Sequence, residues 1–125
     1  MASRLLIVDD SPQFLEAAAT LLERQGCDIV AVASNSADAT RLARELAPDV
    51  VLLDVDLGLE DGFEVADRLV ADHGQRVVLI SAYGESEIAE LIASSSALGF
   101  ISKSELSARR LAEVVDGSRP SDRNS

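Results

Sequence analysis

Five short apolar runs, each followed by a stretch with helical periodicity, constrain the fold more than any other feature of this sequence. The runs lie at residues 5–8, 29–32, 50–53, 77–80 and 99–101, and the last is the shortest. They are rich in Val, Ile and Leu and do not alternate between apolar and polar residues. Such unbroken runs are typical of strands in a parallel sheet that is covered on both faces. We therefore expect five parallel strands.

The segments between these runs repeat apolar residues at helical spacing. The apolar stripes span 14–22, 39–46, 63–70, 88–92 and 106–115, and the stripe at 88–92 is the weakest. Ser11 and Pro12 supply an N-cap and a first-turn proline to the first helix. Regular alternation of strand and helix implies an open α/β sheet with right-handed crossovers. The predicted fold is flavodoxin-like, a doubly wound (βα)5 domain with strand order 2-1-3-4-5.

Length and charge limit the classes of function. A chain of 125 residues forms one domain, which we place at residues 1–116, and we expect 117–125 to be a disordered tail or the start of a linker. The formal net charge of -11 disfavours binding to nucleic-acid phosphates or to anionic membranes. The single cysteine, Cys27, allows no internal disulfide, and the first residues resemble neither a secretory signal nor a membrane span. A cytoplasmic location is expected.

Acidic residues directly follow the first and third predicted strands. Asp9 and Asp10 come after 5–8, and Asp54 comes after 50–53. In an open α/β sheet, ligands bind beyond the carboxyl ends of the strands where the strand order reverses, which here is between these two strands. Two carboxylates about 4 Å apart repel by roughly 4 kcal/mol at an effective dielectric constant of 20, so the cluster needs a cation. Oxygen ligands favour a hard divalent ion such as Mg²⁺.

Two further polar residues follow the last two strands. Ser81 comes after 77–80, and Lys103 comes shortly after 99–101. Each residue alone is more often a turn residue or a solvated charge than part of a site. Together, however, a carboxylate, a metal site, a hydroxyl donor and an ammonium fit phosphoryl transfer, in which the protein positions groups and neutralises oxygens.

The order of these residues resembles that of response-regulator receiver domains, and the resemblance covers residues 3–116. The matching positions are Asp9-Asp10, Asp54, Ser81-Ala82 and Lys103. The resemblance implies that Asp54 accepts a phosphoryl group from the phosphohistidine of a histidine kinase or phosphotransfer protein. It also implies a Mg²⁺ ion held by the carboxylates of Asp9, Asp10 and Asp54 and by the backbone carbonyl of Asp56.

The same resemblance assigns roles to the residues around the acceptor. Ser81 and Lys103 would bind the phosphoryl oxygens, and Phe100 would be the aromatic switch residue that moves inward on activation. Asp56 and Tyr83 occupy two variable positions that flank the site, where they would alter the access of water to a phospho-aspartate. The output surface would be formed by the fourth helix, the fifth strand and the fifth helix.

The chain departs from the family pattern at three positions. Gly58 stands in the acceptor loop where proline is frequent, so we expect a less rigid loop. Ser104 follows Lys103 where the family often has a cis proline, and a cis bond to another residue costs about 2.5–4 kcal/mol, so we expect a trans bond. Phe100 replaces the commoner tyrosine and offers no hydroxyl group.

The predicted function is a Mg²⁺-dependent signalling switch that is no enzyme beyond catalysing its own phosphorylation and dephosphorylation. Its expected partners are a histidine kinase or phosphotransfer protein and a downstream protein or effector domain, and a homodimer is possible. One alternative is a pseudo-receiver, which binds proteins without phosphorylation. Another is a phosphatase of the haloacid-dehalogenase type, whose Asp-x-Asp motif matches Asp54-Val55-Asp56. That class carries the motif on its first strand and needs a longer chain.

Overall fold

The sheet confirms the predicted topology. The computed structural model describes residues 3–117. The main sheet contains β1 (Arg4–Val8), β2 (Asp28–Ala33), β3 (Val50–Asp54), β6 (Val77–Ser81) and β7 (Gly99–Ser102). These strands are all parallel and lie in the order β2-β1-β3-β6-β7, which is 2-1-3-4-5 when only the strands of this sheet are counted. Val8 and Leu53 are paired in the register of β1 with β3, so the ends of these two strands lie side by side.

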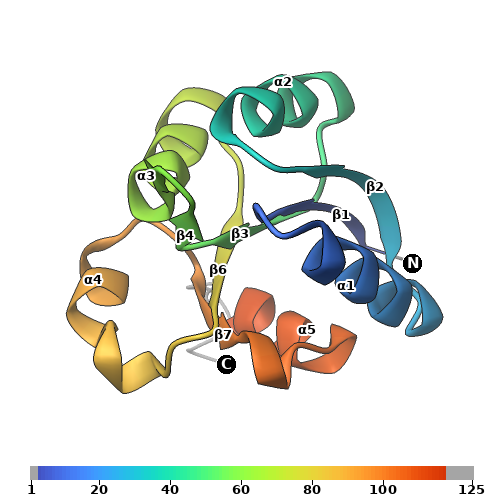
Figure 1. The fold of residues 1–125 in the computed structure, drawn as a ribbon. Helices are drawn as coiled ribbons and strands as arrows, with labels where there is room; N and C mark the ends of the chain where they lie inside the picture. Colours follow the sequence, from blue (N-terminus) through green and yellow to red (C-terminus); the bar gives the residue numbers. More distant parts are fainter. Residues whose placement is uncertain (1–2, 118–125) are drawn as a thin grey trace, which may run out of the picture.

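Helices cover both faces of the sheet (Figure 1). They are α1 (Pro12–Arg24), α2 (Ser36–Leu46), α3 (Gly62–His73), α4 (Ala89–Ser94) and α5 (Ala108–Gly117). There are two short 3-10 turns: η1 (Glu85–Glu87) precedes α4, and η2 (Lys103–Glu105) follows β7. The predicted tail at 117–125 lies outside the described residues, apart from Gly117, which ends α5. No helix within residues 3–117 is long and apolar enough to cross a membrane.

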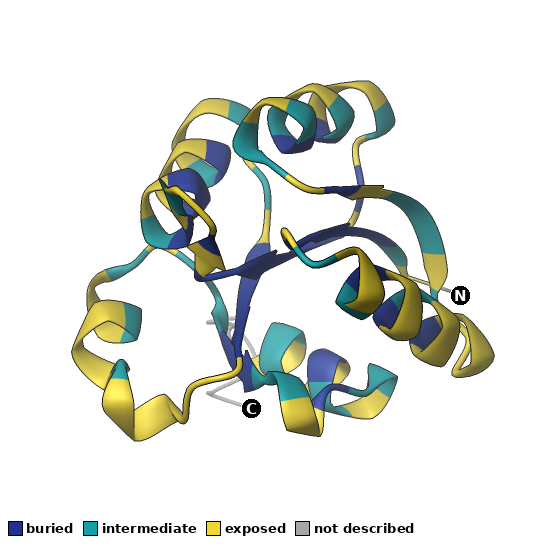
Figure 2. Cartoon of the chain, in the orientation of Figure 1, coloured by how far each residue is buried: buried dark blue, intermediate teal, exposed yellow. Residues whose placement is uncertain are grey.

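The sheet has a separate aliphatic core on each of its two faces. Alternate residues of β1 point to opposite faces, so that Leu5 and Ile7 pack towards α1 and α5 while Leu6 and Val8 pack towards α2 and α3. All four of these side chains are fully buried. Figure 2 shows the consequence: the central strands are buried along their length, whereas α4 is mostly exposed. The sequence pattern predicted this sheet because burial on both faces demands unbroken apolar runs.

A small antiparallel hairpin, which the sequence analysis did not predict, lies between β3 and α3. Its strands are β4 (Asp56–Leu57) and β5 (Glu60–Asp61). The turn between them begins with Gly58 at φ 70°, a conformation that favours glycine and that proline, with φ near −65°, cannot adopt. Gly58, at the position where the family often has proline, therefore forms part of the turn between β4 and β5. There is no cis peptide bond among residues 3–117, and the Lys103–Ser104 bond is trans, as predicted.

Candidate functional site

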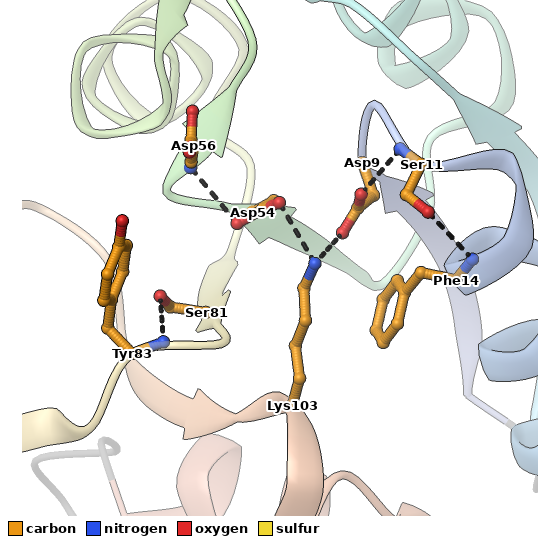
Figure 3. Close-up of polar contacts among 8 residues, drawn as sticks. All are labelled: Asp9, Ser11, Phe14, Asp54, Asp56, Ser81, Tyr83 and Lys103. Atoms are coloured by element: carbon orange, nitrogen blue, oxygen red, sulfur yellow. Dashed lines mark hydrogen bonds and ion pairs between the residues drawn. The ribbon is translucent and has the colours of Figure 1, made fainter.

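The carboxyl ends of four neighbouring strands converge on one hollow of about 230 Å³. Asp9 follows β1, Asp54 ends β3, Ser81 ends β6 and Lys103 begins η2 directly after β7. Figure 3 shows the side chains of Asp9, Asp54 and Lys103 meeting at one point, with Ser81 nearby and its hydroxyl turned towards the backbone nitrogen of Tyr83. The lining is completed by residues of the connecting loops: Asp10, Ser11, Asp56, Ala82 and Tyr83. The structure thus brings together every residue predicted for the site except Phe100.

Asp9 is fully buried at the inner end of the hollow. Its Oδ1 accepts a hydrogen bond of 2.8 Å from the backbone N–H of Ser11. Its Oδ2 lies 2.6 Å from Nζ of Lys103, but no hydrogen bond of good geometry reaches this oxygen from the described residues. The Asp9 carboxylate is therefore held in place at one oxygen and ion-paired at the other.

Asp54 is 5% exposed and lies between two donors. Its Oδ1 accepts from the backbone N–H of Asp56 at 3.1 Å, and its Oδ2 lies 3.2 Å from Nζ of Lys103. Burial raises the pKa of Asp54 to about 6, and the charge of Asp9 adds to this, while the bond from Asp56 and the charge of Lys103 oppose it. Ionisation of Asp54 is therefore unfavourable in this site, and a further positive charge would stabilise the ionised carboxylate.

Lys103 joins the two buried carboxylates, as Figure 3 shows. Burial alone would lower the pKa of Lys103, but its ion pair with the Asp9 carboxylate and the charge of Asp54 outweigh that effect and raise the pKa. The ammonium also lies 4.3 Å from the centroid of the Phe14 ring, within the range of a cation–π interaction. The sequence analysis missed this role of Phe14, because its helical spacing indicated only a core position.

A divalent cation fits the three carboxylates at this edge of the sheet. Asp9, Asp10 and Asp54 each offer a carboxylate oxygen, and these oxygens lie within 4.8 Å of one another. Asp10 is exposed, so an ion would be reachable from solvent, while the buried Oδ2 of Asp9 lacks a hydrogen bond. Hard oxygen donors of this kind are what Mg²⁺ and Ca²⁺ prefer. The arrangement is therefore suited to a metal ion and an anionic group beside it.

Ser81 and Tyr83 border the opposite side of the hollow. Ser81 is 1% exposed, and its Oγ accepts a hydrogen bond of 2.9 Å from the backbone N–H of Tyr83. Because a hydroxyl that accepts one bond can still donate its own proton, Ser81 can donate to an anion in the hollow. The Tyr83 ring is half-exposed beside it. Phe100 lies instead in the core, 6% exposed, on the face covered by α2 and α3.

Gly62 allows the end of β3 and the start of α3 to approach closely. A Cβ on Gly62 would lie 2.2 Å from the carbonyl oxygen of Asp54 and 2.6 Å from Cα of Val55. The backbone N–H of Gly62 donates to the carbonyl of Val55 at 2.9 Å, and the Asp61 side chain caps α3 by accepting from Phe63 N–H. The Asp-Gly pair at the end of the loop thus fixes the backbone on which Asp54 is placed.

Comparison with known proteins agrees with this geometry. The family model described as "Response regulator receiver domain" matches residues 5–116. The transcription regulator BvgA of Bordetella pertussis is 32% identical over 120 residues, which cover 95% of this chain and 56% of BvgA. The DNA-binding response regulator MtrA of Mycolicibacterium smegmatis is 39% identical over 82 residues, 66% of this chain and 36% of MtrA.

Solved structures agree as well. The two-component response regulator of the LuxR family from Aurantimonas sp. SI85-9A1 superposes with a TM-score of 0.81 and 28% identity, over 94% of this chain and 86% of that one. The chain spans about half the length, or less, of the curated relatives it matches.

Proposed function

Because this chain belongs to the response regulator receiver domain family, we propose that it is a signalling switch that accepts a phosphoryl group on Asp54 in a Mg²⁺-dependent reaction. One observation carries the choice of acceptor: the buried Asp54 carboxylate lies at the hollow between the Lys103 ammonium and the Asp56 N–H. The proposed donor is the phosphohistidine of a histidine kinase or of a phosphotransfer protein.

The transfer needs little from the protein beyond positioning and charge. A carboxylate oxygen of Asp54 forms a bond to phosphorus as the P–N bond to the donor histidine breaks, and the histidine nitrogen keeps the electron pair of that bond. Lys103, whose raised pKa keeps it protonated, would move its ammonium from the carboxylates to a phosphoryl oxygen. Ser81 would donate its hydroxyl proton to another oxygen.

The metal ion would be held by the carboxylates of Asp9, Asp10 and Asp54 and by the backbone carbonyl of Asp56. When bound, it would neutralise charge on the phosphoryl oxygens and on the cluster of carboxylates. The fit of the three carboxylate oxygens supports this assignment. The buried Asp9 would contribute a fixed ligand, since its Oδ1 is already held by Ser11.

We propose that phosphorylation acts on Ser81 and Phe100 as switch residues and on the surface of α4, β7 and α5 as the output face. A phosphoryl group adds a charge of about −1.5 to −2, which can draw Ser81 and Lys103 inward. Phe100 occupies a buried position on β7, next to Leu79 of β6 in the register. Asp56 and Tyr83, which flank the hollow, would set the access of water to the phospho-aspartate.

The partner of the output face would be a downstream protein or an effector domain. Relatives such as MtrA are named as DNA-binding regulators and are longer than this chain, which supports an effector domain. The net charge of -11 supports an output that does not involve direct nucleic-acid binding by this domain.

The test is the intact mass of the protein after incubation with acetyl phosphate and Mg²⁺. Wild type is expected to gain one phosphoryl group, and the gain is expected to disappear with EDTA or in Asp54→Asn. Asp72→Asn is the matched control, because Asp72 is an exposed aspartate on α3, away from the hollow. A folded wild type that gains no phosphoryl group and binds no beryllofluoride would favour the pseudo-receiver instead.

A further inference from the structure

The carboxylate of Glu60, on the hairpin after the acceptor, is bonded to the beginning of α2. The backbone N–H of Ser36 donates to Glu60 Oε1 at 2.8 Å, and the Ser36 hydroxyl donates to Oε2. Ser36 is the first residue of α2, where backbone N–H groups have no partner within the helix and the helix dipole favours negative charge. These hydrogen bonds hold the pKa of Glu60 below its usual range.

The same hairpin carries the backbone that contacts the acceptor. Glu60 pairs with Leu57 across the hairpin, and Asp61 pairs with Asp56. The N–H of Asp56 donates to Asp54 Oδ1, and the carbonyl of the same residue is the proposed backbone ligand for Mg²⁺. A continuous set of bonds therefore leads from the start of α2, through Glu60 and the hairpin, to the acceptor carboxylate.

Apolar packing holds the hairpin through β4 only, whereas β5 is held by the hydrogen bonds that Glu60 accepts from Ser36 and Asp61 accepts from Phe63. Leu57 on β4 is 4% exposed and belongs to the core, whereas Leu59 at the turn is fully exposed. Gly58 lies against the acidic pair, since a Cβ there would be 3.2 Å from Asp10 Oδ2. A shift of β5 or of the turn would therefore change both the backbone at Asp56 and the space beside Asp10.

We propose that Glu60 is a positioning residue, which clamps the hairpin to α2 and so sets the affinity of the carboxylate cluster for a divalent cation. The inference rests on the proposed function, because it takes the cluster to be the Mg²⁺ site. Glu60 does not line the hollow and acts through the backbone of the hairpin. Groups that orient metal ligands from outside the ligand shell typically change metal affinity by about 10–100-fold.

The experiment measures Mg²⁺ binding without phosphorylation. Tyr83 is the only tyrosine, the chain has no tryptophan, and Tyr83 lines the hollow, so its fluorescence can follow a Mg²⁺ titration. Glu60→Ala is expected to weaken Mg²⁺ binding by about tenfold, at the lower end of the usual range because Glu60 acts indirectly. Glu60→Gln is expected to stay close to wild type, since its carboxamide can accept from the Ser36 N–H and donate to the hydroxyl.

Glu23→Ala is the matched control. Glu23 is an exposed glutamate near the end of α1, so this variant loses the same charge without touching the hairpin, and it is expected to bind Mg²⁺ like wild type. Thermal midpoints are measured for all variants. Wild-type Mg²⁺ affinity in Glu60→Ala, even with a lower midpoint, would overturn the inference and leave Glu60 a purely structural role.

The failure of the inference can be told apart from the failure of the proposed function. Phosphorylation by acetyl phosphate is followed by mass in the same variants over a range of Mg²⁺ concentrations. The proposed function fails if wild type gains no phosphoryl group, whatever Glu60→Ala does to Mg²⁺ binding. The inference is supported if Glu60→Ala requires about tenfold more Mg²⁺ for half-maximal phosphorylation and reaches a similar rate at saturation.

Discussion

The ammonium of Lys103 lies 2.6 Å from Oδ2 of Asp9, a carboxylate with no exposed surface. A buried carboxylate without a partner is costly, because the charge loses its hydration. Lys103 therefore stabilises the acidic cluster of this structure, in addition to its proposed role in binding a phosphoryl group. A divalent cation on the same carboxylates would compete with the lysine for them, and this competition can be measured.

Replacement of Lys103 by methionine is expected to destabilise the protein most strongly in EDTA. Removal of one partner of a buried ion pair costs about 3–5 kcal/mol, and we expect about 2–3 kcal/mol here because the Lys103 side chain is 21% exposed. Added Mg²⁺ should then stabilise the variant more than it stabilises wild type, since the ion replaces the missing charge. Urea unfolding with EDTA and with Mg²⁺ measures both effects.

Arg109→Met is the control for this experiment. Arg109 also forms an ion pair, with Glu113, but its side chain is 91% exposed, so we expect a loss below about 1 kcal/mol and no dependence on Mg²⁺. Equal losses in the two variants would contradict the stabilising role of Lys103.

Asp54→Asn is expected to stabilise the metal-free protein at neutral pH. The folded-state pKa of Asp54 is raised from 3.8 to about 6, so the native state binds this proton more tightly than the unfolded chain does. Protonated Asp54 therefore stabilises the folded state. This stabilisation is fully present below about pH 4 and is lost as the pH rises through about 6. Asparagine keeps the oxygen that accepts from Asp56 but carries no charge, so the variant avoids this loss.

The size of this effect follows from the pKa difference. One pKa unit corresponds to about 1.4 kcal/mol, so we expect Asp54→Asn to gain about 1–3 kcal/mol at pH 7.5 in EDTA. The gain should vanish near pH 4, in the range where the aspartate is protonated. Urea unfolding of both proteins between about pH 4 and pH 8 gives the curve, and a gain independent of pH would refute the assigned cause.

Gly62→Ala is expected to be severely destabilising. The new Cβ would collide with backbone atoms of Asp54 and Val55, which cannot move without displacing β3, so we expect a loss of about 3 kcal/mol or more. Gly84→Ala is the control, since its Cβ would meet only the flexible end of Glu87 at 3.4 Å and should change stability by less than about 1 kcal/mol. Thermal unfolding of the two variants makes the comparison. Similar midpoints would show that the backbone at Asp54 and Val55 tolerates displacement.

Ser81→Ala is expected to slow phosphorylation by acetyl phosphate without preventing the protein from folding. A hydrogen bond to a charged group contributes about 1.5–3 kcal/mol, so the loss of the hydroxyl should reduce the rate by about 10- to 100-fold. Ser81→Thr keeps the hydroxyl and should retain most of the rate. Ser86→Ala, an exposed serine in η1, is the control. An unchanged rate in Ser81→Ala would remove Ser81 from the proposed phosphoryl site.

The sequence was sufficient to predict the sheet and the place of the site. Runs such as 50–53 must be buried on both faces, and alternation with helices leaves few topologies for five such strands. Once the strands are parallel, their carboxyl ends share one edge, so Asp9, Asp54, Ser81 and Lys103 must meet there. The assignment of their roles stays a prediction until the phosphorylation experiment is done.

The contacts within the site could not be predicted in this way. The hairpin has only two residues in each strand, too few for a periodic pattern, and the turn at Gly58 replaces a proline of the family pattern. The bond between Glu60 and Ser36 joins residues 24 positions apart, and nothing in either segment indicates the other. The contact between Phe14 and Lys103 likewise depends on how α1 packs beside η2.

By itself, the sequence determined which residues are buried in the sheet and which end of it carries the polar groups, because hydrophobic pattern and chain connectivity are local properties of the chain. The tertiary structure alone decided that Lys103 pairs with Asp9 as well as Asp54, and that Asp54 has a pKa of about 6. Ion pairing and desolvation depend on distances of a few ångströms between segments far apart in the chain, and only the packed fold sets those distances.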